Sequence, residues 1–330
     1  MLKLLFSVFC SVPNKKAFFL KQDQCTYDEI SSGRSVSQTP LIFNVSDCNF
    51  FRSTVYNNHG GVIYFKDVEF DMKVSNSMFY NCIVEAPYSG GAIYCYSSTG
   101  QSVISMTCAS SCTCSDWGHF VWSLTSTSKQ NKLNYVSVTL CSPSQVGNGP
   151  IALDYGHQGA TYLNDTNNKA ETRSGFNVFE PSSFLMSYSS ISFNKATTMI
   201  CVRMYGKGGS VTSSNIVGNN MPSNGVISIG NNGQYSYTGC IFYDNFKTLF
   251  CVDSGNLEIS SCYIYHNDIM TSGSVTALSI ISQKANSFTL VFYSTYHCLV
   301  DSNVKTIIVL SSFSNKMLIL SLFHYVLISI

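Results

Sequence analysis

Short apolar segments recur along this chain at a nearly regular interval. Each unit begins with a four-residue motif, as in Cys48-Asn-Phe-Phe and Cys240-Ile-Phe-Tyr. A second apolar segment, often led by glycine, follows further along, as in Gly60-Gly-Val-Ile-Tyr. Within it, apolar residues occupy every other position, which is the period of a β-strand with one buried face. The pattern therefore predicts a series of similar β units.

Nine such units can be placed, with gaps of 22 to 32 residues between their starts. The starts are Cys48, Ser77, Met106, Val138, Thr161, Ser190, Ser214, Cys240 and Cys262. The inward pairs of the strands that follow are Ile63/Phe65, Ile93/Cys95, Phe120/Trp122, Ile151/Leu153, Phe176/Val178, Ile200/Val202, Ile227/Ile229, Phe250/Val252 and Val275/Ala277. Ser192 breaks the apolar position of its unit, and apolar Ile191 and Phe193 beside it indicate a register one residue off.

A repeat of this length indicates stacked supersecondary units. One short strand cannot bury its apolar side alone, but stacked units can pair their strands in parallel, about 4.8 Å apart. Each unit then contacts only its neighbours, as in other solenoids. We find no amphipathic helix after residue 40, no Leu-x-x-Leu-x-Leu repeat, and units too short for propeller blades. We predict an all-β fold, a single right-handed parallel β-helix of about nine coils.

The extent of the repeat divides the chain into three predicted segments. Residues 1–40 contain a short signal-like apolar stretch and a cap, and residues 41–300 form the β-helix. Residues 301–330 form an apolar cap or a truncated membrane anchor. The stretch Met317 to Ile330 has no Asp, Glu, Lys or Arg, but it is shorter than the ~20 residues that a membrane-spanning helix needs.

Asparagines occur late in several units, and they predict a structural ladder. They are Asn81, Asn194, Asn219, Asn245 and Asn267. Asparagine tolerates left-handed backbone angles, and stacked copies can share side-chain hydrogen bonds. A role in the turns is sufficient to explain them without a ligand.

Composition favours a folded, exported protein. Apolar residues make up 45% of the chain and charged residues only 11%, so the chain should bury a core. The formal net charge of +1 gives no electrostatic reason to expect nucleic acid. Two sequons, at Asn44 and Asn164, and fourteen cysteines favour an extracellular or cell-surface location.

The cysteines allow several interpretations. Cys108, Cys112 and Cys114 have the donor type of a zinc site, but no second set at finger spacing follows, so buried thiols or one local disulfide are favoured. Cys240 and Cys262 occupy the same position of adjacent units, at a separation compatible with a disulfide. We favour an unbonded thiol ladder over a bond between them.

Two motifs resemble those of a known family. Gly90-Gly-Ala-Ile93 and Phe242-Tyr-Asp-Asn245 match the Gly-Gly-Ala-Ile and Phe-x-x-Asn motifs of polymorphic outer-membrane protein repeats. Gly60 to Ile63, Ile216 to Asn219 and Ile264 to Asn267 are relaxed copies, so the similarity covers roughly residues 45 to 290. The resemblance implies a right-handed β-helix surface protein, with adhesion as its role and no catalytic residues. No room is left after the repeat for the translocator barrel of bacterial members, so their secretion route is not implied.

No catalytic, cofactor-binding or metal-binding residue is assigned from the sequence. Asp154 and Asp253 share a position four coils apart, about 19 Å at the strand spacing, which is too far for paired catalytic carboxylates. Asp67, Glu69 and Asp71 are interpreted as a solvated face rather than a cation site. We interpret the cluster from Asp154 to Glu180, with His157, Asp165, Glu171 and Arg173, as a charged loop.

Four aromatic residues have two interpretations. Trp117, Trp122, Tyr94 and Tyr96 have the composition of a sugar-stacking patch. We favour instead core and coil-surface positions, the common places for aromatic residues.

The function that follows is a non-enzymatic exported or cell-surface β-helix, possessing a long side that binds a glycan or protein partner on the cell surface. The first alternative is a carbohydrate-active β-helix enzyme of the polysaccharide lyase or glycosidase type, which a cleft with two or three close acids would favour. The second is a degenerate copy with no retained activity, which the irregular register near Met106 and Ser192 suggests. No cofactor is expected, and membrane contact is expected only through the C-terminus.

Overall fold

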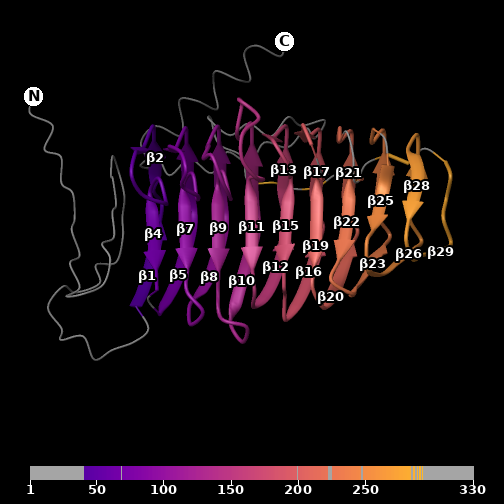
Figure 1. Ribbon diagram of the computed structural model, residues 1–330, viewed down its shortest axis with the longest axis horizontal. Coiled ribbons are helices and arrows are strands. Elements are labelled where there is room, and N and C mark those ends of the chain that lie inside the picture. The colour runs from indigo at the N-terminus through magenta and orange to yellow at the C-terminus, as the bar shows by residue number, and fades with distance from the viewer. Residues whose placement is uncertain are drawn as a thin grey trace, which may run out of the picture.

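The computed structural model describes residues 41–292, except 68, 199, 222–224, 247, 284, 287, 289 and 291. Within these residues the chain is all β, and its parallel strands are stacked as a solenoid (Figure 1). The predicted parallel β-helix of about nine coils is confirmed. The predictions for residues 1–40 and 301–330 concern positions outside the described set.

One strand of every coil joins a nine-stranded parallel sheet, which faces the viewer in Figure 1. Its strands are β4 (Ile63–Lys66), β7 (Ile93–Tyr96), β9 (Val121–Leu124), β11 (Ile151–Asp154), β15 (Phe176–Phe179), β19 (Val202–Tyr205), β22 (Ile227–Gly230), β25 (Thr248–Val252) and β28 (Asp268–Ser272). Each strand pairs with the strand of the next coil, so the sheet runs the length of the stack.

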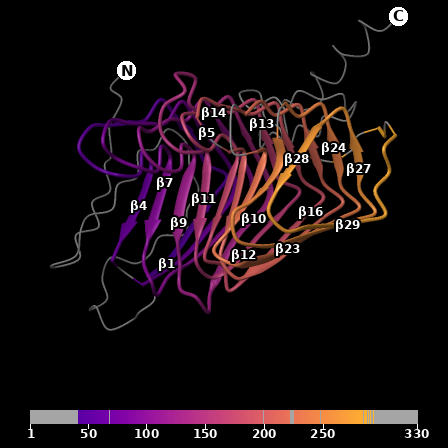
Figure 2. The same ribbon diagram turned by 45° about the vertical axis from the view of Figure 1, so that its right-hand side comes forward.

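The rest of each coil joins a sixteen-stranded sheet, several strands of which are labelled in Figure 2, where the C-terminal end of the stack is turned toward the viewer. Its strands are β1 (Leu41–Ser46), β2 (Asn49–Phe51), β5 (Phe70–Tyr80), β8 (Gln101–Ser110), β10 (Gln130–Thr139), β12 (His157–Thr161), β13 (Asn164–Thr166), β16 (Ser183–Ser187), β17 (Ser190–Ser192), β20 (Gly208–Thr212), β21 (Asn215–Val217), β23 (Gly233–Thr238), β24 (Ile241–Tyr243), β26 (Gly255–Ser260), β27 (Tyr263–Tyr265) and β29 (Val275–Leu278). Two small sheets complete the coils: β3 (Thr54–Val55) with β6 (Ile83–Val84), and β14 (Lys169–Ala170) with β18 (Lys195–Ala196).

The core consists of apolar ladders, because paired residues of successive coils point the same way. In the nine-stranded sheet one ladder contains Ile63, Ile93, Val121, Ile151, Phe176, Val202, Ile227 and Phe250. In the larger sheet the facing ladder contains Phe50, Phe79, Ala109, Val138, Asp165, Ile191, Ile216, Phe242 and Ile264. Phe242 and Phe250 meet across the interior, with ring centroids 5.2 Å apart.

Seven details of the predicted register are wrong: four unit starts, two inward pairs, and the sheet to which a third pair belongs. Thr107, Val136, Leu163 and Ser189 take the ladder position assigned to Met106, Val138, Thr161 and Ser190, as the pairing of β8, β10, β13 and β17 requires. The inward pairs are Val121/Ser123 and Val202/Met204, not Phe120/Trp122 and Ile200/Val202. Val275 and Ala277 belong to β29 in the larger sheet, whereas β28 supplies the last strand of the nine-stranded sheet.

The four errors in the unit starts share one physical cause, a bend residue in left-handed conformation between the two parts of the larger sheet. Met106, Tyr135, Tyr162 and Tyr188 all have positive φ there. Each such residue adds one position that breaks the alternation, as a bulge does. Tyr162 stacks between the other two tyrosines, at centroid distances of 4.5 and 5.4 Å. Ser192 is therefore next to the inward position, which Ile191 occupies as the sequence indicated.

An asparagine ladder holds the C-terminal coils together. Its members are Asn168, Asn194, Asn219, Asn245 and Asn267. The Oδ1 atom of each accepts the backbone N–H of the ladder residue in the preceding coil, at 2.8 to 3.1 Å. The Nδ2 atom donates to a carbonyl of the preceding coil, so each side chain connects adjacent coils.

In the N-terminal half, cysteines replace the asparagines of this ladder. Cys82, Cys112 and Cys141 hold the same position as free thiols, completely buried. Asn81 is one residue before this position and has positive φ, so its predicted place in the ladder is wrong. The predicted stacking of Cys240 on Cys262 is confirmed, and both are free thiols: the backbone N–H of Cys240 lies 3.3 Å from the sulfur of Cys262. Cys108 is disulfide-bonded, whereas Cys112 and Cys114 are free, so these three form no local disulfide.

Asp165 is a carboxylic acid inside the core. It holds an apolar ladder position between Val138 and Ile191 and is completely buried. Its Oδ1 accepts a hydrogen bond of 2.5 Å from Asn168 Nδ2, while its Oδ2 has no partner in the described structure. Burial raises the pKa of this carboxyl well above its usual range, which favours the neutral form. Its interpretation as part of a charged loop is therefore wrong.

Outward residues beside this ladder are covered. Asn164, the acceptor of the second sequon, is 2% exposed and its Nδ2 has no described partner. Two coils further along the same row, Asn215 exchanges two hydrogen bonds with the backbone of Phe288, at 3.0 and 3.1 Å. The folded chain therefore presents Asn44, which is half-buried, more openly than Asn164.

No helix long and apolar enough to cross a membrane occurs in the described part of the chain.

Replacing one ladder asparagine should destabilise the stack. Asn219→Ala leaves the backbone N–H of Asn194 and the carbonyl of Ile191 without their partners. We expect a loss of about 2 to 4 kcal/mol in the free energy of unfolding, since a buried polar group left unpaired costs roughly 1 to 3 kcal/mol. Urea unfolding followed by circular dichroism measures it. Asn57→Ala, at an exposed position, is the control and should change little; equal effects would contradict the ladder.

Candidate functional site

The outer face of the nine-stranded sheet gathers aromatic and charged side chains. Alternation along each strand creates two outward rows. The first row is Tyr64, Tyr94, Trp122, Ala152, Asn177, Arg203, Ser228 and Cys251. The second row begins with Lys66, Tyr96, Leu124, Asp154, Phe179, Tyr205 and Gly230.

The N-terminal end of this face is a closely packed aromatic platform. Tyr64 and Tyr94 stack with centroids 5.5 Å apart, and His59 stacks on Tyr94 at 4.2 Å. Trp122 stands edge-on to Tyr94 at 5.2 Å and lies 5.9 Å from Tyr96. Tyr64 and Tyr94 are buried under their neighbours, whereas Trp122 and Tyr96 are half-buried and offer surface to solvent.

Trp122 is joined to a carboxylate of the next coil. Its Nε1–H donates to Asp154 Oδ2 at 2.8 Å. Burial raises the pKa of Asp154 to about 6, while the indole N–H and the charges of Arg203 and Arg173 oppose the rise. The ionised and neutral forms of this carboxyl are therefore both accessible near neutral pH.

Two arginines lie on the C-terminal side of Asp154. The guanidinium of Arg173 lies 4.5 Å from the centroid of the Trp117 ring. The guanidinium of Arg203 lies 4.5 Å from the centroid of Tyr205 and 5.8 Å from that of Phe179. Such stacking keeps a guanidinium flat on the surface, with its N–H groups directed sideways. We call Trp122, Asp154, Arg173 and Arg203, together with Asn177 beside Arg203 in the first outward row, the arginine patch.

A groove of about 700 Å³ borders the patch at the end of strands β7, β9 and β11. Tyr96 and Tyr155 line it together with a series of hydroxyl groups and one carboxylate. The lining residues are Asp67, Tyr96, Ser97, Ser98, Thr99, Leu124, Thr125, Thr127 and Tyr155. We call it the tyrosine groove. Tyr96 belongs to both features, because its ring also contacts Trp122.

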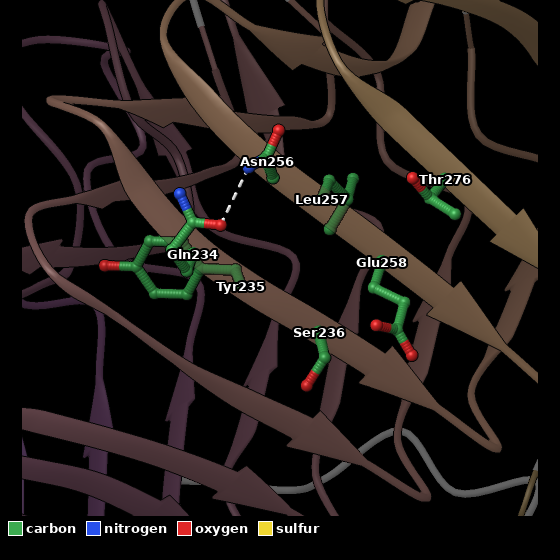
Figure 3. Close-up of a pocket in the computed structure, with 7 residues that line it drawn as sticks. All are labelled: Gln234, Tyr235, Ser236, Asn256, Leu257, Glu258 and Thr276. Carbon is green, nitrogen blue, oxygen red and sulfur yellow. Dashed lines mark hydrogen bonds between the residues drawn. The ribbon is translucent and has the colours of Figure 1, made fainter.

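The larger sheet carries two smaller depressions. One, of about 450 Å³, is lined by polar residues of β23, β26 and β29, among which Asn256 Nδ2 donates to Gln234 Oε1 at 2.8 Å (Figure 3). Its aromatic residue, Tyr235, is buried in the core. The other, of about 440 Å³, lies around Gly159, beside the His157 to Ser183 contact of 2.9 Å. Neither combines open aromatic surface with a charged cluster as the outer face of the nine-stranded sheet does.

The structure bears on two interpretations made from the sequence. The four aromatic residues singled out in the sequence come together on one outer face, where Tyr94 is buried and Trp117, Trp122 and Tyr96 are half-buried. The cluster from Asp154 to Glu180 is not one charged loop. Asp154 ends β11 and bonds Trp122, whereas Arg173 covers Trp117.

Sequence reasoning missed Arg203, Tyr155, Phe179 and Asn177. A signal existed for three of them, because alternation places Arg203 and Asn177 outward once the strand register is known, and Phe179 shares a row with Asp154. Tyr155 lies in the turn after a strand, where the alternation of apolar and polar residues does not indicate which way a side chain points.

The remaining acidic candidates lie apart from the patch. Asp253 follows Val252 at the position level with Gly230, four coils after Asp154, as the sequence indicated. At about 4.8 Å per coil the separation is far beyond the ~5 to 9.5 Å of paired glycosidase carboxylates. Asp71 lies 4.0 Å from Lys73, and among the described residues no group of three or more His, Cys, Asp or Glu is placed to hold a metal ion.

No protein-family model, no curated protein and no solved structure matches this chain. Its stacked parallel strands are those of a β-helix repeat protein. The resemblance to polymorphic outer-membrane repeats rests on the motifs themselves, whose Phe-x-x-Asn asparagine is the ladder residue Asn245.

The contact between Trp122 and Asp154 predicts a pH-dependent tryptophan signal. Emission should change with a midpoint near pH 6, because protonation of Asp154 weakens its hydrogen bond to the indole. Fluorescence titration measures this, and Asp154→Asn and Trp122→Phe should each abolish the transition. Trp117→Phe is the matched control and should retain it. A midpoint unaffected by Asp154→Asn would assign the signal to another group.

Proposed function

We propose that this chain is an exported, non-enzymatic β-helix protein that binds a glycan with the outer face of its nine-stranded sheet. The observation that carries the proposal is the adjacency of the tyrosine groove and the arginine patch. Sugars present apolar C–H faces and hydroxyl edges, so their sites combine aromatic faces with hydrogen-bonding groups. This region combines Tyr96, Tyr155 and Trp122 with five serine and threonine residues and Asp154.

The dimensions of the groove support a small ligand or a short segment of a polymer. Its volume of about 700 Å³ falls within the range of ~300 to 1,000 Å³ for small-molecule sites. Ser98, Thr99 and Thr127 lie exposed at its rim, where their hydroxyl groups can donate and accept. The site lies on the side of a rigid stack, so binding needs no folding of a loop, which lowers its entropic cost.

A catalytic role is less well supported. A glycosidase needs a second carboxylate within reach of the first. The groups whose charges act on Asp154 are Arg203 and Arg173, which stabilise the anion and do not supply a second acid. Adhesion through a bound glycan fits this arrangement and agrees with what the family resemblance implies.

Glycan binding is tested with the purified chain on an array of neutral and acidic oligosaccharides. Tyr96→Ala and Tyr155→Ala should weaken binding by about three- to tenfold each, the effect of losing one aromatic contact. Tyr162→Ala removes a stacked tyrosine from the larger sheet and should leave affinity unchanged. Binding equally sensitive to all three, or absent, would overturn the proposal. Release of shortened or unsaturated sugar products would replace it with the enzyme alternative.

Export is a separate component of the proposal. Labelling of intact producing cells with a membrane-impermeant amine reagent should modify the protein at exposed lysines such as Lys129. A cytosolic marker labelled only after lysis is the control. A protein labelled only after lysis, like that marker, would contradict export and the adhesive role.

A further inference from the structure

The arginine patch has donors that its own chain does not satisfy. Arg203 forms no hydrogen bond or ion pair with the described residues, and it is held by stacking on Tyr205 and Phe179. A guanidinium carries five N–H donors in a plane, a geometry suited to carboxylate, sulfate or phosphate. Arg203 is half-buried, so water satisfies these donors only on its open side.

Arg173, in the adjacent coil, also has a donor that the described chain leaves without a partner. Its Nη1 donates to Asn148 Oδ1 at 3.0 Å, while its Nε is buried without a partner. Burial and the like charge of Arg203 lower the pKa of Arg173 to about 10. An anion bound at the patch would oppose both effects, because a negative charge nearby favours the charged form of a guanidinium.

Two shorter side chains separate Trp122 from Arg203 on the outer face. The first outward row contains Ala152 and Asn177 between the large side chains of Trp122 and Arg203. Asn177 is 2% exposed, and its Oδ1 has no hydrogen-bond partner in the described structure. Strand alternation directs this side chain outward, into the patch. A buried acceptor without a partner costs free energy unless a bound group supplies a donor.

The positive charges of Arg173 and Arg203 are also not paired directly with a carboxylate. Asp154 is the acid whose charge acts on both arginines, and Asp253 acts on Arg203. Asp154 uses Oδ2 for Trp122 and lies more than 4.0 Å from either guanidinium, since no ion pair joins them. The arginines thus have no direct anionic partner here.

We infer that the glycan bound by this face is anionic, with a carboxylate or sulfate group between Arg203 and Arg173. This inference rests on the proposed glycan-binding function and specifies its ligand class. The sugar ring that carries the anion lies toward Trp122, and a neighbouring hydroxyl group donates to Asn177 Oδ1. The next sugar along the chain enters the tyrosine groove past Tyr96.

The test compares sugars that differ only in charge. Calorimetry with oligogalacturonate and with its methyl ester measures the contribution of the carboxylates, and a heparin oligosaccharide of similar length reports on sulfate. We expect the acid form to bind at least tenfold more tightly than the ester, the scale of one charge-assisted hydrogen bond. Added salt should reduce this preference, because the anion site is partly open to solvent.

Variants assign the preference to the patch. Arg203→Gln and Arg173→Gln should each bring the affinity for the acid form close to that for the ester, with melting temperatures confirming that both fold. Arg52→Gln, at an exposed position in the first coil, is the control and should retain the preference. A sulfated sugar preferred over the carboxylated one supports the inference and identifies the anion.

The outcomes separate this inference from the proposed function. If acid and ester bind equally and Tyr96→Ala still weakens both, the face binds glycans without a charge requirement, and the anionic site is overturned. If neither these sugars nor any neutral glycan binds, the proposed function fails and the inference fails with it. If the acid form is preferred but Arg203→Gln retains the preference, the anion binds elsewhere on the molecule.

Discussion

The parallel hydrogen bonding of each coil to the next, in constant register, is the constraint on which the rest of this structure depends. It places equivalent residues of successive coils about 4.8 Å apart and facing the same way. Apolar residues at an inward position therefore become a continuous ladder, such as the one from Ile63 to Phe250. The same geometry makes a side-chain hydrogen-bond ladder possible, since each asparagine finds its partner one coil away.

Different residue types can occupy the same ladder position in different coils. The Asn194 position is occupied by thiols in three N-terminal coils, where Cys82, Cys112 and Cys141 fill the space as small apolar groups. Asp165 shows the limit of this tolerance. Burial in an apolar ladder raises the pKa of this carboxyl and so disfavours its charged form, and one hydrogen bond from Asn168 satisfies only one of its oxygens.

The same stacking of coils also arranges the side chains of the outer face. Aromatic rings and arginines from successive strands lie side by side without any loop to position them, which makes the proposed binding surface rigid. Trp122, Asp154 and Arg203 come from β9, β11 and β19, far apart in the sequence, yet they share one surface. Small residues between them, Ala152 and Asn177, keep the centre of the face low.

The sequence by itself determined the architecture, because period-two alternation and the repeat length depend on local chemistry that each unit contains in full. It also indicated the asparagine ladder and the stacking of Cys240 on Cys262, which recur at fixed offsets within the motif. Which way individual side chains point was decided only by the tertiary structure. A single left-handed bend residue, such as Met106 or Tyr162, shifts the register by one, and a shift of one residue exchanges the two faces of a strand. For that reason the inward place of Asp165 and the contact of Asp154 with Trp122 depend on pairing between coils, which no single unit of the sequence contains.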